Sequence, residues 1–429
     1  MLTMKTLNRF LVATAAVAAA AASPPARADI VTDWNTLAGH FITEAKLGTP
    51  PAMRVMAIVQ TAVHGAIGSL PPAGTAGPDS AAMTAVAVAA ANRATLAALL
   101  PAQQVAIDAA YQAALGPWSE GATPAAKVAA AVTAGERAAA QVLAARAKEA
   151  PVFAAPDTTR PHVGTPGSYV PTALPAATAW PQRTPWVMAS ASQFRPAAPP
   201  ALTSETYARD LEEIRAVGGR ASTRRSAEQT EIARFWDYSL PAIYHGVVRS
   251  VALAPGRDAA ANARLFATVA QAMDDALIAV FDAKYHHGFW RPVTAIRNAD
   301  IDGNDATTRE ANWLPLINVP MHPEYPSGHC ILAGAVGAVL KAEVGSAPVK
   351  LSTTSPTAKG AARHWTSIDD FEREVAMARV WGGLHFRFTN EVSLGMGRAI
   401  GELAVQRQRQ QQAAAAAPDS AAPAGHGAE

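Results

Sequence analysis

Apolar positions recur with a helical period along most of the chain. Between residues 33 and 148, a closely spaced apolar run from Met53 to Val63 is followed by alanine-rich stretches with scattered charges. Patterns of this kind are typical of helices that bury one face, and we expect a bundle of four or five helices. Helical periodicity resumes near Ser204 and continues to about residue 295. Its breaks lie at residues that end helices, namely Gly218-Gly219, Pro241 and Pro255.

Three stretches lack this periodicity. Residues 151–203 are rich in proline and form an irregular connection, which we expect to lie over the bundle, and residues 300–325 have the prolines and glycines of a loop. Pro326 then favours the start of an apolar helix at Ser327. A last helical region from about residue 368 is interrupted near Gly382, and the polar tail at residues 410–429 has a composition typical of disorder.

The composition agrees with an all-α fold. Half of the side chains are hydrophobic, alanine dominates, and aromatic or β-branched runs of strand length are scarce. We therefore expect little or no sheet. The pattern predicts an N-terminal helical region at residues 29–150 that packs on a C-terminal helical bundle at residues 204–409.

The first 28 residues have the features of a secretory signal peptide. A basic start with Lys5 and Arg9 precedes a short apolar stretch and a small-residue run that ends at Ala28. The apolar stretch has about 13 residues, fewer than the roughly 20 that span a bilayer. We expect cleavage after residue 28 and a secreted or periplasmic protein.

Charge and cysteine content exclude several classes of protein. Loss of residues 1–28 lowers the formal net charge from +2 to −1, which implies no nucleic-acid partner. Cys330 is the single cysteine, so no internal disulfide forms, and nothing near it needs a thiolate. Charged residues interrupt the most apolar windows of the remaining chain, and we expect a soluble protein without an integral membrane span.

Three short segments concentrate histidines and cations. They are Lys284 to Pro292 (KYHHGFWRP), Pro326 to His329 (PSGH) and Arg379 to His385 (RVWGGLH). Guanidinium and ammonium groups, together with backbone amides, supply the donors that a tetrahedral oxyanion needs. The second segment opens a predicted helix, whose free amides and dipole favour an anion. The segments predict one pocket for phosphate or vanadate.

The order and spacing of these segments resemble the superfamily of type 2 phosphatidic acid phosphatases and vanadium haloperoxidases, whose signature is K-x6-RP, then PSGH, then SR-x5-H-x3-D. The first two parts match fully. In the third part, Ala378 replaces the serine and Thr389 replaces the aspartate that usually fixes the ring of the histidine. Asn390 and Glu391, the next residues along the chain, are candidates for that function, and what orients His385 stays open at this point.

The resemblance implies a role for each matched residue. Lys284, Arg291 and Arg379 would bind the equatorial oxygens of the oxyanion, and Ser327 and Gly328 would donate further hydrogen bonds. His385 would attack phosphorus or bind the vanadium of vanadate directly, and His329 would be the acid–base partner. Residues expected to line the pocket are His322, His287 and Trp290, with Trp381 as a further apolar wall.

Three functions remain open at this point. The runs from Phe289 to Ile296 and from His322 to His329 resemble soluble bacterial haloperoxidase-like members, and brominating members carry a histidine at the position of His322. These likenesses favour a vanadate-dependent haloperoxidase that uses hydrogen peroxide and bromide. The alternatives are a secreted acid phosphatase that hydrolyses a phosphate ester through phosphohistidine at His385, without cofactor, and a non-catalytic oxyanion binder. A homo-oligomer stays open for each of them.

Overall fold

A computed structural model describes residues 29–71, 78–119, 123–149, 164–358 and 360–416, and within these ranges the protein is helical, as predicted. The helices are α1 Ile30–Glu44, α2 Thr49–Gly68, α3 Pro78–Leu99, α4 Gln104–Ser119, α5 Ala125–Arg146, α6 Glu205–Gly218, α7 Ala227–Phe235, α8 Pro241–Ala252, α9 Ala259–His287, α10 Pro292–Arg297, α11 Gly328–Val344, α12 Ile368–Trp381 and α13 Arg387–Ala416. Strands β1 Leu351–Thr354 and β2 Ala362–Trp365 form a small antiparallel hairpin with Leu351 opposite Trp365. The all-α prediction is confirmed.

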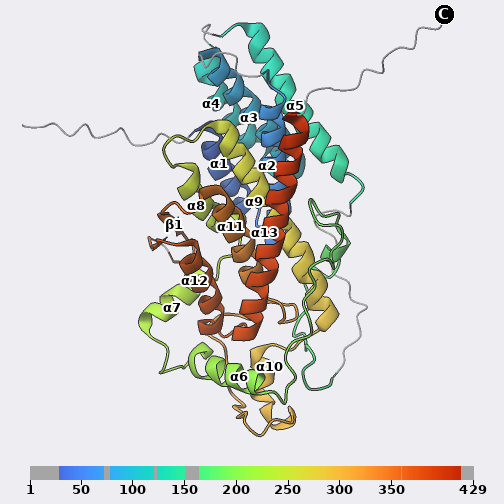
Figure 1. Ribbon diagram of the computed structural model, residues 1–429, viewed down its shortest axis with the longest axis vertical. Helices are drawn as coiled ribbons and strands as arrows, with labels where there is room; N and C mark the ends of the chain where they lie inside the picture. The colour runs from blue at the N-terminus through green and yellow to red at the C-terminus, as the bar shows by residue number, and fades with distance from the viewer. Residues whose placement is uncertain (1–28, 72–77, 120–122, 150–163, 359, 417–429) are drawn as a thin grey trace, which may run out of the picture.

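The molecule is elongated, and α9, α11 and α13 run along its length (Figure 1). Helices α3, α4 and α5 lie at one end, and α6 and α10 lie at the other. With 29 residues, α9 is about 43 Å long. It packs against α2 of the N-terminal region as well as α11 and α13.

One apolar core joins the N-terminal and C-terminal regions. It contains Val55 of α2, Phe266 and Val280 of α9, and Val336 of α11, all at most 1% exposed. A smaller, largely aromatic cluster packs along α6 and includes Tyr207 of its first turn, which is fully buried. The two regions therefore share a core through α9, and the C-terminal bundle does not close upon itself.

The described part of the irregular connection, residues 164–203, contacts loops of the C-terminal region and α9. The Tyr169 amide donates to the carbonyl of Gly288 (2.7 Å), and the Ala176 amide donates to the carbonyl of Met321 (2.7 Å). Farther along, Asp275 of α9 accepts the amides of residues 186–188 at 2.7–3.0 Å. These bonds fix the described part of the connection along the side of α9 rather than over the N-terminal helices alone.

The C-terminal boundary differs from the prediction. Helix α13 continues to Ala416, seven residues into the segment expected to be disordered from residue 410. The run of glutamines and alanines there has high helix propensity and extends a helix that is already nucleated. The predicted signal peptide at residues 1–28 lies outside the described residues.

One described helix is long and apolar enough to cross a membrane, by length and composition. It is Asp79–Leu99 within α3, and 61% of its most apolar window is buried inside the protein. That burial is typical of a core helix in a bundle.

Candidate active site

Five helix ends bring the three predicted segments together. Lys284 lies in the last turn of α9, Arg291 is the N-cap of α10, Ser327 is the N-cap of α11, and Arg379 lies in the last turn of α12. His385 follows in the short connection to α13. Burial lowers the pKa of the His385 imidazole far below its usual range, and the nearby charges of Arg291, Lys284 and Arg379 lower it further. The signature residues thus form one buried group.

The connection between α12 and α13 needs its glycines. Gly383 has φ +77°, and a Cβ there would lie 2.5 Å from the carbonyl oxygen of Gly218. Only glycine adopts this conformation at so close an approach. The turn lets the amides of Leu384 and His385 bond back to the carbonyl of Arg379, at 3.0 and 3.4 Å. The turn therefore places the His385 ring beside the helix that carries Arg379.

Lys284 is fully buried and fixes the loop that leads to α11. Its ammonium donates to the carbonyls of Pro323 (2.8 Å), Glu324 (2.9 Å) and Pro326. These three acceptors match the three N–H groups of an ammonium. Lys284 would contact a bound oxyanion only by giving up one of these carbonyls, which qualifies the direct contact implied by the resemblance.

Arg291 connects His322 with His385. Its guanidinium donates to the His322 carbonyl (2.9 Å), to His322 Nδ1 (2.9 Å), to the Leu384 carbonyl (3.2 Å) and, more weakly, to His385 Nε2 (3.4 Å). The phenyl ring of Phe281 packs edge-on against His322. His322 therefore lies beside Arg291, where that guanidinium and an aromatic ring hold it.

Three buried polar atoms in this group make no hydrogen bond of ordinary geometry within the described ranges. They are Ser327 Oγ, His329 Nε2 and Arg379 Nε. Buried polar atoms are rarely left without a partner unless a ligand or ordered water supplies one. A hydroxyl, an imidazole nitrogen and a guanidinium N–H can all bond an oxygen-rich anion. The donor set therefore fits phosphate or vanadate.

The cations of this group likewise lack acidic partners. Lys284, Arg291 and Arg379 are at most 2% exposed, and none of them forms an ion pair with an acidic side chain in the described part of the chain. Arg379 donates to the carbonyl of Trp236 (2.6 Å). Burial lowers the pKa of Arg291 to about 10. Three desolvated cations that only carbonyls and histidine nitrogens solvate create a strong preference for an anion.

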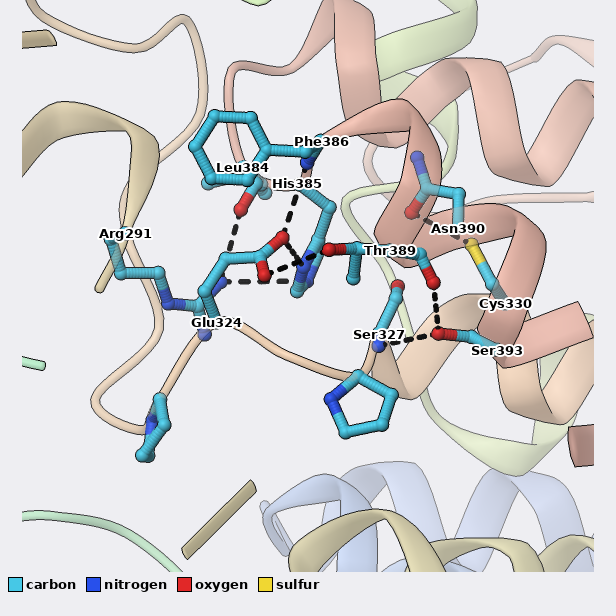
Figure 2. Close-up of polar contacts among 12 residues, drawn as sticks. Arg291, Glu324, Ser327, Cys330, Leu384, His385, Phe386, Thr389, Asn390 and Ser393 are labelled. Atoms are coloured by element: carbon cyan, nitrogen blue, oxygen red, sulfur yellow. Dashed lines mark hydrogen bonds and ion pairs between the residues drawn. The ribbon is translucent and has the colours of Figure 1, made fainter. Parts of the chain in front are cut away.

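Glu324, which the sequence interpretation did not select, contacts the ring of His385. His385 Nδ1 lies 2.9 Å from Glu324 Oε1, and the Phe386 amide donates to the same oxygen at 3.1 Å (Figure 2). The Thr389 hydroxyl donates to the other oxygen at 2.9 Å. Glu324 is fully buried, in the loop before α11.

The prediction that Asn390 or Glu391 fixes the ring is wrong. The Asn390 amide donates to the carbonyl of Ala376 (3.0 Å), and its oxygen lies 3.2 Å from Cys330 Sγ (Figure 2). Glu391 is exposed. Successive residues of a helix point about 100° apart, so the two residues after Thr389 face away from His385.

The remaining predicted residues lie around this group. Trp290 is 2% exposed and belongs to the aromatic cluster beside the site. His287 contacts the irregular connection instead, with Nε2 3.2 Å from the Pro196 carbonyl. Burial raises the pKa of the Cys330 thiol to about 12, which keeps it protonated. Among the described residues, no cluster of three or more histidine, cysteine or acidic side chains could hold a metal ion directly.

A cleft of about 220 Å³ leads to Arg291 from the surface. Its wall combines the arginines 220, 291 and 297 with the apolar side chains of Leu314 and Val319. No acidic side chain lines it. The cleft gives anions a route toward the buried group.

Comparisons with known proteins agree with this geometry. Residues 264–413 match the family described as the VCPO second helical-bundle domain. The vanadium chloroperoxidase of Curvularia inaequalis is 32% identical over a 141-residue alignment that covers 27% of this chain and 22% of that protein. The match thus spans about a fifth of that relative's length.

Solved structures share the fold over most of the chain. The first bacterial vanadium-dependent iodoperoxidase superposes with a TM-score of 0.71 at 23% identity and covers 90% of this chain and 97% of that one. A holo-type bacterial vanadium-dependent chloroperoxidase superposes with a TM-score of 0.67 at 19% identity, covering 85% and 93%. The resemblance noted in the sequence is confirmed. Residues 264–413, about a third of the chain, thus match a vanadium chloroperoxidase domain family, which supports the resemblance carried by the three sequence segments.

Proposed function

We propose that this protein is a vanadate-dependent haloperoxidase that oxidises bromide, and more easily iodide, with hydrogen peroxide. The net reaction converts peroxide, halide and one proton into hypohalous acid and water, so the halide loses two electrons and the O–O bond breaks. The buried cations without carboxylate partners are the observation that carries the proposal. The likeness to vanadium-dependent chloroperoxidases and an iodoperoxidase supports the choice of vanadate.

The residues of the site would hold the oxyanion from several sides. Arg291, Arg379, Ser327 and the first amides of α11 would bind its oxygens, and His385 Nε2 would bind vanadium. When bound, vanadate supplies the Lewis acid that activates hydrogen peroxide for oxidation of the halide. The aromatic cluster excludes water and strengthens these charge interactions.

His329 would carry the proton that the reaction consumes. Burial, and then the charge of Arg379, lower the pKa of its imidazole well below the usual range. A bound anion opposes both causes, because it offsets the positive charge and favours the imidazolium. His329 Nε2, which is buried without a hydrogen-bond partner within the described ranges, would then be the atom that gives this proton.

The test compares wild type with His385→Ala after each is loaded with orthovanadate. We expect halogenation of an organic acceptor with peroxide and bromide or iodide, lowered on the order of 10²-fold or more in the variant, because the direct vanadium ligand is lost. Phosphate release from an aryl phosphate is measured in parallel. Halogenation that does not depend on vanadate, or hydrolysis without halogenation, would overturn the proposal.

A further inference from the structure

Position 389 is where this chain departs most from the signature. Aspartate in that place fixes the catalytic histidine in the superfamily pattern, and Thr389 cannot supply a carboxylate. A carboxylate is nevertheless present at the ring, because Glu324 reaches it from another element, 61 residues away along the chain.

The residues around Glu324 supply hydrogen-bond donors to its carboxylate. Its two oxygens meet three hydrogen-bond donors: the His385 ring, the Phe386 amide and the Thr389 hydroxyl (Figure 2). The backbone of Glu324 is fixed as well, since its amide donates to the carbonyl of Phe289 (2.9 Å) and its carbonyl accepts from Lys284. Glu324 is therefore held both at its carboxylate and at its backbone, so it can hold the ring of His385 in one orientation.

The same contacts define the tautomer of His385. Burial raises the pKa of Glu324 to about 7, and in its ionised form this carboxylate only accepts, so the hydrogen bond at Nδ1 then requires a proton on that nitrogen. Arg291 only donates, so His385 Nε2, which faces its guanidinium, carries a lone pair. This is the form that binds vanadium or attacks phosphorus through Nε2.

Thr389 and Glu324 exclude the usual arrangement. The Thr389 hydroxyl lies 2.9 Å from Glu324 Oε2, so an aspartate at position 389 would bring a second carboxylate into contact with the first. Two buried carboxylates at that distance repel each other. Threonine instead donates a hydrogen bond to Glu324, and the two residues form a matched pair.

We propose that Glu324 is the positioning residue of His385, and that this chain supplies the orienting carboxylate from the loop before α11 instead of from α13. The inference rests on the proposed role of His385 as the direct contact to the oxyanion. It does not depend on whether the enzyme halogenates or hydrolyses.

The test moves the carboxylate between the two positions. Orthovanadate binding to the purified full chain is measured by titration for wild type, E324A, E324Q, T389D and the double variant E324A/T389D. We expect E324A to weaken binding about 10- to 100-fold, as loss of an orienting partner does at metal ligands, and the double variant to regain at least about fivefold of that loss. T389D alone weakens binding, because its new carboxylate repels Glu324.

A spectroscopic measurement separates positioning from general damage. In protein labelled with ¹⁵N-histidine, the Nδ1–H of His385 should give a low-field correlation in wild type and in the double variant, and none in E324A. E324Q keeps the volume and one accepting oxygen, so it decides the question of charge if E324A does not fold. The control is E391Q, which alters the exposed neighbour and should bind vanadate as wild type does.

Failure of the proposed role of Glu324 can be told apart from failure of the proposed function. Wild type that binds vanadate without halogenating would defeat the proposed function and leave this test intact, since binding is its measurement. Unchanged affinity in both E324A and E324Q, or a double variant no tighter than E324A, would overturn the role of Glu324.

Discussion

Helix α9 carries two buried charge clusters, about 15 Å apart along its axis, and they are neutralised differently. At Asp274, the guanidinium of Arg54 pairs with that carboxylate (2.6 Å) and with Glu149. At Lys284, three cations share the interior with one carboxylate, Glu324, which bonds to a histidine instead of to a cation.

The pKa shifts express this difference. Burial lowers the pKa of Arg54, but Asp274 and Glu149 more than compensate, and the net shift is upward. Burial lowers the pKa of Arg291 to about 10, and the charge of Glu324 does not restore it. A cluster with its own counterions needs no ligand and is destabilised when one partner is removed, whereas a cluster with too few counterions favours binding of an anion.

The largest expected effect is on the neutralised cluster. Asp274→Ala leaves the buried Arg54 with one carboxylate and should lower the free energy of unfolding by about 3 kcal/mol, measured by chemical denaturation. The matched control is Asp79→Ala, which removes an exposed pair with Lys127 and should cost less than about 1 kcal/mol. Equal losses in the two variants would contradict the comparison.

The next effect is on the cluster that lacks a counterion. Vanadate at 100 times its Kd should stabilise wild type by about 2.7 kcal/mol, because it binds the folded state alone. Arg379→Met should abolish most of this gain, yet leave the unliganded protein as stable as wild type or more so, since it removes a desolvated charge. Thermal denaturation with and without vanadate measures both. A large loss of stability in the unliganded variant would show that Arg379 is structural.

The sequence predicted the cation cluster well because the signature is local. Lys284 and Arg291 lie at the two ends of one short segment, and glycine and proline mark the helix ends that place them. The helices could be predicted as well, because apolar periodicity is also a local pattern. Their arrangement around α9, and the core shared by both regions, depend on contacts distant in sequence that no local pattern contains.

Glu324 was missed because its partner is 61 residues away. Its setting did offer a signal: an acidic residue between prolines and tyrosine, next to PSGH, in a chain that lacks the usual aspartate at position 389. The expectation for Asn390 and Glu391 relied on adjacency in sequence. Successive side chains of a helix point in different directions, so the residues next to Thr389 do not reach the group that Thr389 contacts.

The smallest expected effect concerns pH and the carboxylate beside Asp274. Burial raises the pKa of Asp275 to about 6, against the hydrogen bonds from residues 186–188. Its folded pKa exceeds the unfolded value near 4, so the folded state binds more protons between these values and stability falls as pH rises from about 4 to about 6. This contribution is at most about 2.7 kcal/mol across the window, at about 1.36 kcal/mol per pKa unit. Asp275→Asn should remove that slope from the variant's own stability profile, so the difference between variant and wild type should change with pH between about 4 and about 6, as measured by denaturation at several pH values. Glu149, which pairs with Arg54 and Arg146, offers the control, because Glu149→Gln should destabilise the protein without removing the slope.

A difference between wild type and Asp275→Asn that stays constant with pH would mean that Asp275 remains ionised. The three amides would then compensate for the burial of Asp275 as fully as Asp274 compensates for the burial of Arg54.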